Sequence, residues 1–266
     1  MLDVLAEAQG LPELELPAEL RERYGGPLGF EEPRLLANFV SSIDGIVSIP
    51  TLPRSNVLIS GGSETDRFVM GLLRAVAGAV LIGSGTLHGS PNALWTAERI
   101  YPAAADAFAE LRRGLGLPPT PELVVMTGTG SLNVAHPALE AGAVVITTGA
   151  GAASLRGRLP EASTLLELPG GGLVDPTAAV EAVRSRGHSL VLSEAGPHVF
   201  GSLLAAGLVD ELFLTVSPLV AGRSGVTGRF GLVEGVDLLP TATVNARLLS
   251  VRRDDAHLFL RYELRR

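Results

Sequence analysis

The stretch LSEAGPHVFGSLL, from Leu192 to Leu204, places an acidic side chain directly before a glycine turn. An apolar, strand-like run precedes Glu194, and a short helical pattern begins at His198. A carboxylate at the end of a strand can accept hydrogen bonds from a ligand, and a glycine turn lets backbone N–H groups at a helix N-terminus approach an anion. The simpler alternative is that Glu194 satisfies the free N–H groups of its own helix.

Glycine-rich turns also follow three other short apolar runs, so that four such turns lie at successive expected strand ends. In open α/β sheets, ligands bind at the carboxyl ends of the strands. Four turns of this kind indicate a nucleotide or dinucleotide site. The Rossmann spacing G-x-G-x-x-G, with an acidic residue about twenty positions later, does not occur. The four turns are LIGSGTLHGSP, VMTGTGSLN, VITTGAGAAS and LSEAGPHVFGS.

Other chemistries find little support in the residue types. The chain has no cysteine and no lysine, which excludes thiolate metal sites, a cysteine nucleophile and Schiff-base catalysis. Five scattered histidines show no metal-ligand spacing, so we expect no metal. The net charge of −7 argues against sequence-independent nucleic-acid binding. Trp95 is either a stacking face for a ligand ring or, as we favour, a packing residue.

The composition predicts a soluble, cytoplasmic, globular protein. Hydrophobic residues make up 46% of the 266 residues and charged residues 18%, which is enough to bury a sizeable core. The acidic, proline-broken N-terminus does not read as a signal peptide. The nearly uncharged stretch 141–155 is too short to span a bilayer.

The order of the expected elements predicts an α/β fold. Residues 1–33 read as an N-terminal arm, and 34–266 as one domain. Short, uncharged apolar strands alternate with helices, as in parallel sheets. A terminal hairpin that turns at Asp254-Asp255 makes the sheet mixed. We expect helices within 63–77, 104–115, 175–187 and 198–208, with Ser63 and Asp66 as capping groups of the first, and strands within 78–83, 122–128, 142–149, 163–168, 188–196 and 210–220.

Three segments taken in order resemble the reductase domain of bacterial riboflavin biosynthesis. They are FVSSIDGIVS, DRFVMGLLRAVAGAVLIGSGTLHGSP and LSEAGPHVFGSLLAAGLVDELFLTVSPLVAG. The chain lacks the cysteine-containing zinc motif of the deaminase half, so it is identified as a stand-alone member of the RibD C-terminal family. The resemblance implies a dihydrofolate-reductase-like three-layer sandwich with a mixed, mostly parallel sheet, NADPH as cofactor and a homodimer. It also implies a small pyrimidine or pterin substrate, and neither a nucleic-acid nor a membrane partner.

The resemblance also implies roles for particular residues. Glu194 would accept hydrogen bonds from the N–H groups of the substrate ring, and Arg74 would reach a substrate phosphate. Ser42 and Asp44 would line the pocket where nicotinamide meets substrate, with Asp44 or water as the source of the proton. Glu194 and Asp44 are thus the expected catalytic residues. The expected cofactor contacts are Gly83, Ser84, Gly85, Thr86, Thr127, Gly196, Pro197, His198, Val199 and Phe200.

The sequence departs from the family pattern at Ala195, Ile46, Gly128 and in the stretch TLHGSPNALW. These changes weaken the expectation of a ribosyl-phosphate substrate and, to a lesser degree, of a preference for NADP. The leading prediction is an NAD(P)H-dependent reductase of a C=N or imine-like bond, most like 5-amino-6-(5-phosphoribosylamino)uracil reductase. Two alternatives stay open, namely a dihydrofolate-reductase-like activity and a dinucleotide-binding protein without catalysis.

Overall fold

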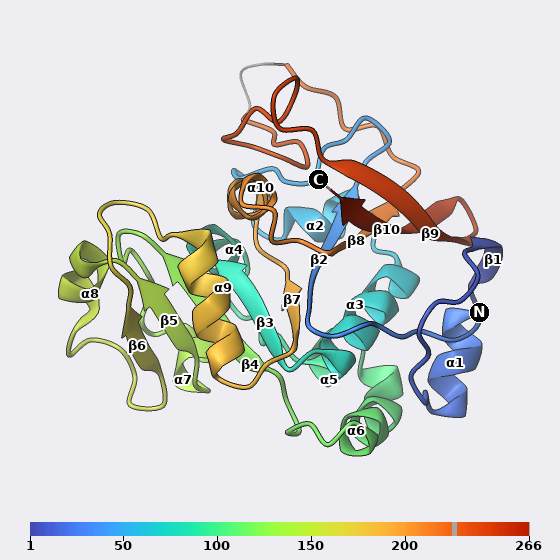
Figure 1. Cartoon of the computed structure of the whole chain (residues 1–266), viewed down its shortest axis with the longest axis horizontal. Coiled ribbons are helices and arrows are strands. Elements are labelled where there is room, and N and C mark those ends of the chain that lie inside the picture. The colour runs from blue at the N-terminus through green and yellow to red at the C-terminus, as the bar shows by residue number, and fades with distance from the viewer. Residues whose placement is uncertain (225–227, 266) are drawn as a thin grey trace.

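One mixed sheet organises the computed structural model, which describes residues 1–224 and 228–265 (Figure 1). Over these residues ten strands pair in the order β1-β9-β10-β8-β2-β7-β3-β4-β5-β6. They are β1 (Asp3–Glu7), β2 (Arg34–Ser41), β3 (Ala79–Gly83), β4 (Glu122–Thr127), β5 (Val144–Thr147), β6 (Thr164–Glu167), β7 (Leu190–Ser193), β8 (Glu211–Val216), β9 (Asn245–Asp254) and β10 (His257–Arg265).

The seven strands from β8 to β6 run parallel, and the remaining pairings, through β10 and β9 to β1, are antiparallel. Strands β3, β5 and β7 are buried at every residue, as their uncharged apolar sequences predict. The C-terminal hairpin turns between Asp254 and His257, with Asp255 at a positive φ of 50°. The predicted mixed, mostly parallel sheet with a terminal hairpin is therefore confirmed.

Helices cover both faces of the sheet and make the three-layer arrangement. One apolar cluster joins the sheet to α1, α3 and α6, and a second joins the opposite face to α9 and α10 (Figure 1). The helices are α1 (Ala18–Tyr24), α2 (Ser55–Ile59), α3 (Glu64–Val76), α4 (Ser84–Gly89), α5 (Ala97–Ile100), α6 (Ala105–Gly114), α7 (Pro137–Glu140), α8 (Gly149–Leu155), α9 (Pro176–Ser185) and α10 (Pro197–Ala205), with a 3₁₀ turn at Pro102–Ala104.

Helix α3 is fixed at both of its ends. At the start, the Ser63 hydroxyl accepts the backbone N–H of Asp66 at 3.1 Å, which satisfies one of the free donors of the first turn. At the other end, the buried Arg112 guanidinium of α6 donates to the carbonyls of Arg74, Ala75 and Ala77 at 2.8–3.1 Å. Ser63 caps the helix as predicted, whereas the side chain of Asp66 turns inward and is only 5% exposed.

The N-terminal segment is not an arm outside the domain. Strand β1 pairs with β9 and forms one edge of the sheet. Helix α1 buries Leu20 and Tyr24 in the same apolar cluster as α3. Residues 1–33 therefore complete the fold, and the expected boundary at residue 34 marks only the first residue of β2.

Candidate active site

The carboxyl ends of four neighbouring strands bring the expected site residues together. Strands β2, β7, β3 and β4 are adjacent in the sheet and run parallel. Ser42 follows β2 and Glu194 follows β7, while Gly83 and Thr127 are the last residues of β3 and β4. This is the edge at which ligands of parallel α/β sheets bind.

Two glycine turns at this edge face each other. Gly83 is the N-cap of α4, and Gly196 is the N-cap of α10, so neither helix start has a side-chain cap. A Cβ on Gly83 would lie 3.1 Å from Val199 Cγ2, and a Cβ on Gly196 would lie 3.8 Å from Thr86 Oγ1. By contrast, α8 and α9 begin with hydroxyl and carboxylate caps from Thr148 and Asp175. The backbone N–H groups at the starts of α4 and α10 therefore suit an anionic ligand such as a pyrophosphate.

The side chains in the first turn of α10 point in different directions. The Phe200 ring is buried, with its centroid 4.8 Å from that of Phe39 in the core. His198 is exposed, and its ring stands edge-on to Phe230 at 4.9 Å. A dinucleotide at this turn would therefore meet backbone groups of the expected contact residues 196–200 rather than the Phe200 ring.

The turn after β4 is closely packed against its neighbours. The Thr127 hydroxyl accepts the N–H of Gly130 at 3.2 Å, so it already holds its own turn together. Thr148 Oγ1 donates to the carbonyl of Gly128 at 2.8 Å. A Cβ on Gly128 would lie 2.2 Å from the carbonyl oxygen of Gly172, closer than any side chain allows. Packing against the loop at Gly172 thus explains the glycine at position 128.

Arg74 and Glu194 form a buried ion pair across 120 positions of sequence. Arg74 Nε donates to Glu194 Oε1 at 2.8 Å and Nη2 donates to Oε2 at 2.6 Å. The two side chains are only 6% and 7% exposed. Arg74 Nη1 also donates to the carbonyl of Thr96 at 3.3 Å. The expectation that Arg74 reaches a substrate phosphate does not fit this geometry, because its guanidinium is committed to Glu194.

Ser42 and Asp44 anchor two loops to each other. Ser42 Oγ donates to Asp44 Oδ1 at 2.6 Å and accepts the N–H of Ile46 at 3.0 Å. The Asp44 carboxylate also accepts the backbone N–H groups of Ala221 at 2.9 Å and Gly222 at 2.7 Å. These hydrogen bonds, with that of Ser42 the largest, lower the pKa of Asp44 to about 2. A carboxyl group that stays ionised down to this pH does not suit the expected role of proton donor.

Asp66 is a titratable group of this region that sequence reasoning took only for a helix cap. Burial raises its pKa from 3.8 to about 6, while a hydrogen bond with Thr215 opposes the rise. The negative charge of Glu194 adds to the rise. One feature of the sequence could have identified Asp66 as a buried group. It is an acidic residue on the apolar face of α3, where charged residues are rare.

Two buried hydroxyls at the same strand ends have no hydrogen-bond partner among the described residues. They belong to Ser193, the last residue of β7, and Ser217, which directly follows β8. Both side chains are 0% exposed. Buried polar groups are almost always satisfied by protein, water or ligand. These two therefore mark places where a water molecule or a ligand group would be bound.

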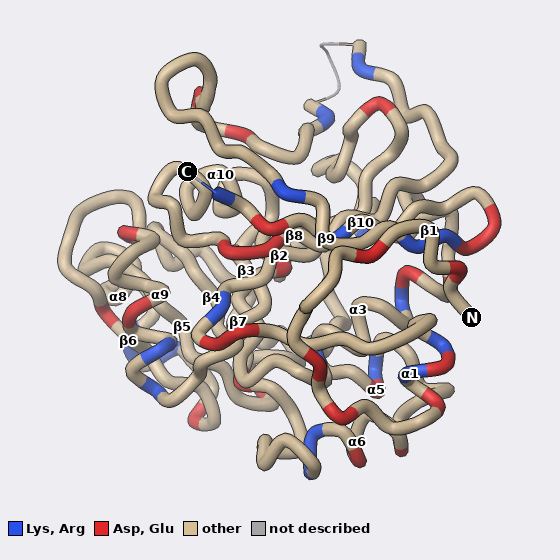
Figure 2. Tube along the Cα trace, turned by 45° about the vertical axis from the view of Figure 1, so that its right-hand side comes forward, with Lys and Arg blue, Asp and Glu red and all other residues tan. Residues whose placement is uncertain are grey.

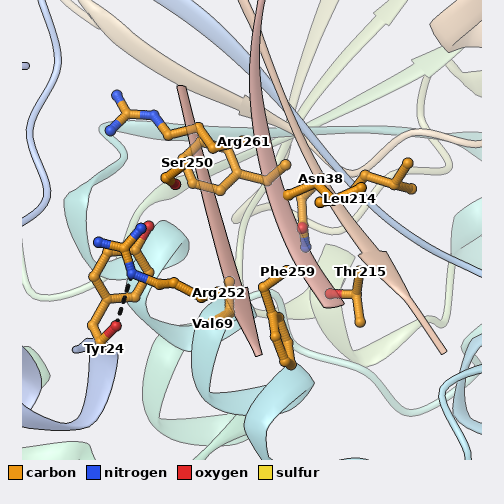
Figure 3. Close-up of a pocket in the computed structure, with 11 residues that line it drawn as sticks. Tyr24, Asn38, Val69, Leu214, Thr215, Ser250, Arg252, Phe259 and Arg261 are labelled. Atoms are coloured by element: carbon orange, nitrogen blue, oxygen red, sulfur yellow. Dashed lines mark hydrogen bonds between the residues drawn. The ribbon is translucent and has the colours of Figure 1, made fainter. Parts of the chain in front are cut away.

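A small, partly open pocket lies between α3 and the strands β8, β9 and β10 (Figure 3). Thr215 lines one part of it and Tyr24 and Arg252 another, with Arg252 Nε donating to the carbonyl of Tyr24 at 3.0 Å. None of the residues expected to bind cofactor or substrate lines it. Its walls are formed by Tyr24, Asn38, Val69, Phe213, Leu214, Thr215, Ser250, Arg252, Phe259, Leu260 and Arg261.

The described residues contain no group of three or more His, Asp or Glu side chains that could hold a metal ion. No helix in ranges 1–224 and 228–265 is long and apolar enough to cross a bilayer. Arginine and acidic residues are interspersed in the view of Figure 2 rather than gathered into one basic region.

Over residues 33–260 the sequence matches the family described as RibD C-terminal domain. A comparison with curated proteins finds no match. Among solved structures, a pyrimidine reductase-like protein from Corynebacterium diphtheriae superposes with a TM-score of 0.69 at 19% identity. That alignment covers 88% of this chain and 92% of the other.

Two further structures share the fold. Acinetobacter baumannii RibD superposes with a TM-score of 0.64 at 20% identity. That alignment covers 88% of this chain and only 59% of the RibD chain. The Saccharomyces cerevisiae riboflavin biosynthesis reductase Rib7 gives 0.58 at 16% identity, with 93% of this chain and 96% of that chain covered. These likenesses confirm the predicted three-layer α/β sandwich, and at such identities they concern the fold alone.

Proposed function

Because the chain belongs to the RibD C-terminal domain family, we propose that it is an NAD(P)H-dependent reductase of a pyrimidine- or pterin-like substrate. The reaction would be reduction of a C=N or imine-like bond, most like that of 5-amino-6-(5-phosphoribosylamino)uracil reductase. The observation that carries the proposal is the pair of facing helix starts at Gly83 and Gly196. The second of them follows the buried carboxylate of Glu194 by two residues.

The residues present fit a dinucleotide. Two adjacent helix N-termini without side-chain caps offer backbone N–H groups to a pyrophosphate. Thr86 borders the space between them, since its hydroxyl lies 3.8 Å from the Cβ position of Gly196. The Ser193 hydroxyl, which has no hydrogen-bond partner in the described part of the chain, lies at the end of the strand that leads into the second turn. We propose NADPH as the cofactor, with Thr127 at its adenosine end.

The protein would hold the nicotinamide ring and the substrate ring next to each other and exclude water, while the bound dinucleotide supplies the hydride. Arg74 fixes the Glu194 carboxylate in one orientation at the end of β7. Each Glu194 oxygen keeps a second lone pair, so the carboxylate can still accept an N–H group of the substrate ring. Ser42 and Asp44 set the shape of the loop after β2 and so the width of the substrate end.

The test has a binding stage and a turnover stage. Isothermal titration with NADPH and, separately, NADH measures whether the glycine turns bind a dinucleotide. The loss of absorbance at 340 nm then measures hydride transfer to 5-amino-6-(5-phosphoribosylamino)uracil and, in parallel, to dihydrofolate. We expect saturable NADPH binding and turnover of the uracil substrate. Binding without turnover of either substrate would refute the reductase, and absence of binding would refute the dinucleotide site as well.

The expected homodimer stays a prediction that light scattering can check. Around the loop that follows β2, several large apolar side chains are exposed and would be available to a second copy of the chain. They are Ile43, Leu52, Val57, Leu58, Leu219 and Val220.

A further inference from the structure

A second pocket lies at the opposite end of the strands from the candidate active site. It has a volume of about 280 Å³ and is partly open to solvent. Arg34, the first residue of β2, and Glu211, the first residue of β8, both line it. The candidate active site lies at the carboxyl ends of these strands, and the eight residues of β2 alone span about 25 Å. A ligand in this second pocket would therefore lie outside the proposed substrate and cofactor sites.

The pocket is preformed, because both of its sides are fixed by hydrogen bonds. Side chains of β8, β9 and β10 form one side of it, and the loop of residues 9–12 contributes another. Directly before this loop, the N–H of Ala8 donates to the carbonyl of Leu249 at 2.7 Å. After it, the N–H of Leu14 donates to the carbonyl of Leu28 at 2.8 Å. A ligand could thus bind without reorganising the fold, as is usual for small-molecule sites.

The charges that line this pocket do not balance. Among the described residues, four arginines and three glutamates line it, which leaves one positive charge in excess. A small organic anion is the kind of ligand that such an excess attracts. The pocket is called the arginine pocket below, after Arg34, Arg247, Arg261 and Arg265.

Two of the arginines have carboxylate partners of their own. Arg261 Nε donates to Glu211 Oε2 at 2.7 Å, and the two side chains are only 4% and 5% exposed. Arg34 Nη2 donates to Glu31 Oε2 at 2.9 Å, and its Nη1 lies 3.6 Å from Asp210 Oδ1. The charges of Arg261 and Arg34 are therefore compensated within the protein.

The other two arginines share a single carboxylate. Arg247 Nε and Arg265 Nε both donate to the same oxygen, Glu263 Oε2, at 2.8 and 2.6 Å. The bond to Glu263 uses only the Nε of Arg247, which leaves its two Nη groups for a further acceptor. The side chains of Arg247 and Arg265 are 46% and 58% exposed, so both reach solvent. The uncompensated positive charge of the arginine pocket is thus shared between Arg247 and Arg265.

We propose that the arginine pocket binds a small phosphate monoester, with the phosphate group between Arg247 and Arg265. A guanidinium presents its N–H groups as a planar fork that matches the oxygens of a phosphate. A volume of about 280 Å³ is close to the lower limit of small-molecule sites, about 300 Å³, so it has room for an organic part as well. The Gln9 side chain lines the same pocket and offers a polar group to hydroxyls of that part.

The test is isothermal titration of the full chain with glucose 6-phosphate, a phosphate monoester of suitable size, and in parallel with glucose and citrate. We expect glucose 6-phosphate to bind with a Kd below about 1 mM, and more weakly as NaCl is added, because the two arginines are partly exposed. Glucose should not bind, since it lacks the charge. Absence of glucose 6-phosphate binding would overturn the inference, and citrate binding of equal strength would overturn the assignment to phosphate.

Variants of the two exposed arginines show whether the ligand is bound in this pocket. Arg247→Gln and Arg265→Gln should each weaken glucose 6-phosphate binding about tenfold or more, because each removes a charged donor. The matched control is Arg253→Gln on β9, since Arg253 is 50% exposed and pairs with Asp3 at 3.0 Å. This control, and Gly83→Ala at the proposed dinucleotide site, should bind glucose 6-phosphate like the wild type. Unchanged binding in both Arg247→Gln and Arg265→Gln would place the ligand elsewhere and overturn the inference.

A variant of the shared carboxylate gives a signature that a purely structural role would not give. If the three charges only stabilise the hairpin, loss of any of them should act in the same direction. If they bind an anion, Glu263→Gln removes the carboxylate that competes for both guanidiniums, so glucose 6-phosphate should bind about tenfold more tightly. Binding that is unchanged or weaker in Glu263→Gln would overturn the inference. None of these titrations depends on NADPH or on turnover, so failure of the proposed reductase would be seen separately.

Discussion

Replacing Asp66 by asparagine should make the protein more stable, and increasingly so as the pH rises. Asparagine has nearly the shape of aspartate and can still bond to the Thr215 hydroxyl, but it carries no charge to bury. The pKa of Asp66 is about 6 in the fold and 3.8 ordinarily, because burial disfavours the carboxylate. One pKa unit corresponds to about 1.4 kcal/mol, so ionising Asp66 inside the fold costs about 3 kcal/mol.

The direction of the effect follows from proton binding. Between pH 4 and pH 6 the folded protein holds the proton of Asp66, and the unfolded chain has already lost it. Folding therefore takes up a proton, and the free energy of unfolding falls as the pH rises. The stabilising contribution of Asp66 to the free energy of unfolding is complete below pH 3.8 and is lost as the pH rises past about 6. Above that pH the wild type carries the whole penalty and the variant carries none.

Urea unfolding measured at several pH values, with the fluorescence of the buried Trp95 as the signal, checks this. The free energy of unfolding of Asp66→Asn minus that of the wild type should grow by about 3 kcal/mol between pH 4 and pH 8. Groups that do not interact with Asp66 titrate alike in both proteins and cancel in the difference. The same comparison with Asp106→Asn, at an exposed aspartate in the first turn of α6, should give a difference that does not change with pH. If the difference in the free energy of unfolding between Asp66→Asn and the wild type does not change with pH, Asp66 is not a buried carboxyl group that holds its proton.

Three further predictions follow from the site. Glu194→Gln leaves the buried charge of Arg74 without its partner, so urea unfolding should show that the free energy of unfolding falls by about 3–5 kcal/mol. A fall below about 1 kcal/mol would contradict a tight ion pair. Gly128→Ser places a Cβ 2.2 Å from a backbone carbonyl and should lower the melting temperature measured by calorimetry, whereas an unchanged value would mean that the adjoining loop moves freely. Gly83→Ala crowds the first turn of α10, and titration should show NADPH binding about tenfold weaker. The control is Gly89→Ala, whose added Cβ meets open space, and this variant should bind NADPH like the wild type.

Local patterns were enough to predict several elements of the fold. The Ser63 cap and the apolar spacing that follows predict α3, and Asp175-Pro176 predicts the start of α9. Hairpin and strand signals also depend on neighbours in sequence, which is why the turn at Asp254-Asp255 was found. The N-terminal segment was not recognised as part of the sheet, because β1 is exposed at every residue and pairs with β9, almost the whole chain away.

The candidate site was predictable as a set of glycine turns and less so as a set of side-chain roles. Residue type and position relative to a strand end can be read from the sequence, and Gly83, Gly196 and Glu194 do lie at or just after the carboxyl ends of β3 and β7. Whether a side chain is free or committed depends on partners far along the chain. The sequence around Arg74 predicts a substrate contact, because nothing local shows that its guanidinium is paired with Glu194.

The sequence by itself determined the type and order of the elements and the glycine turns at their ends, because backbone conformation follows from neighbouring residues. Only the tertiary structure decided that β7 lies between β2 and β3, and so which strand ends meet. That strand order closes the Arg74–Glu194 pair and buries Asp66 against Thr215. It also moves the pKa of Asp44 and of Asp66 in opposite directions. Protonation depends on burial and on the neighbours of each carboxyl group in space, and those neighbours are assembled only when the chain folds.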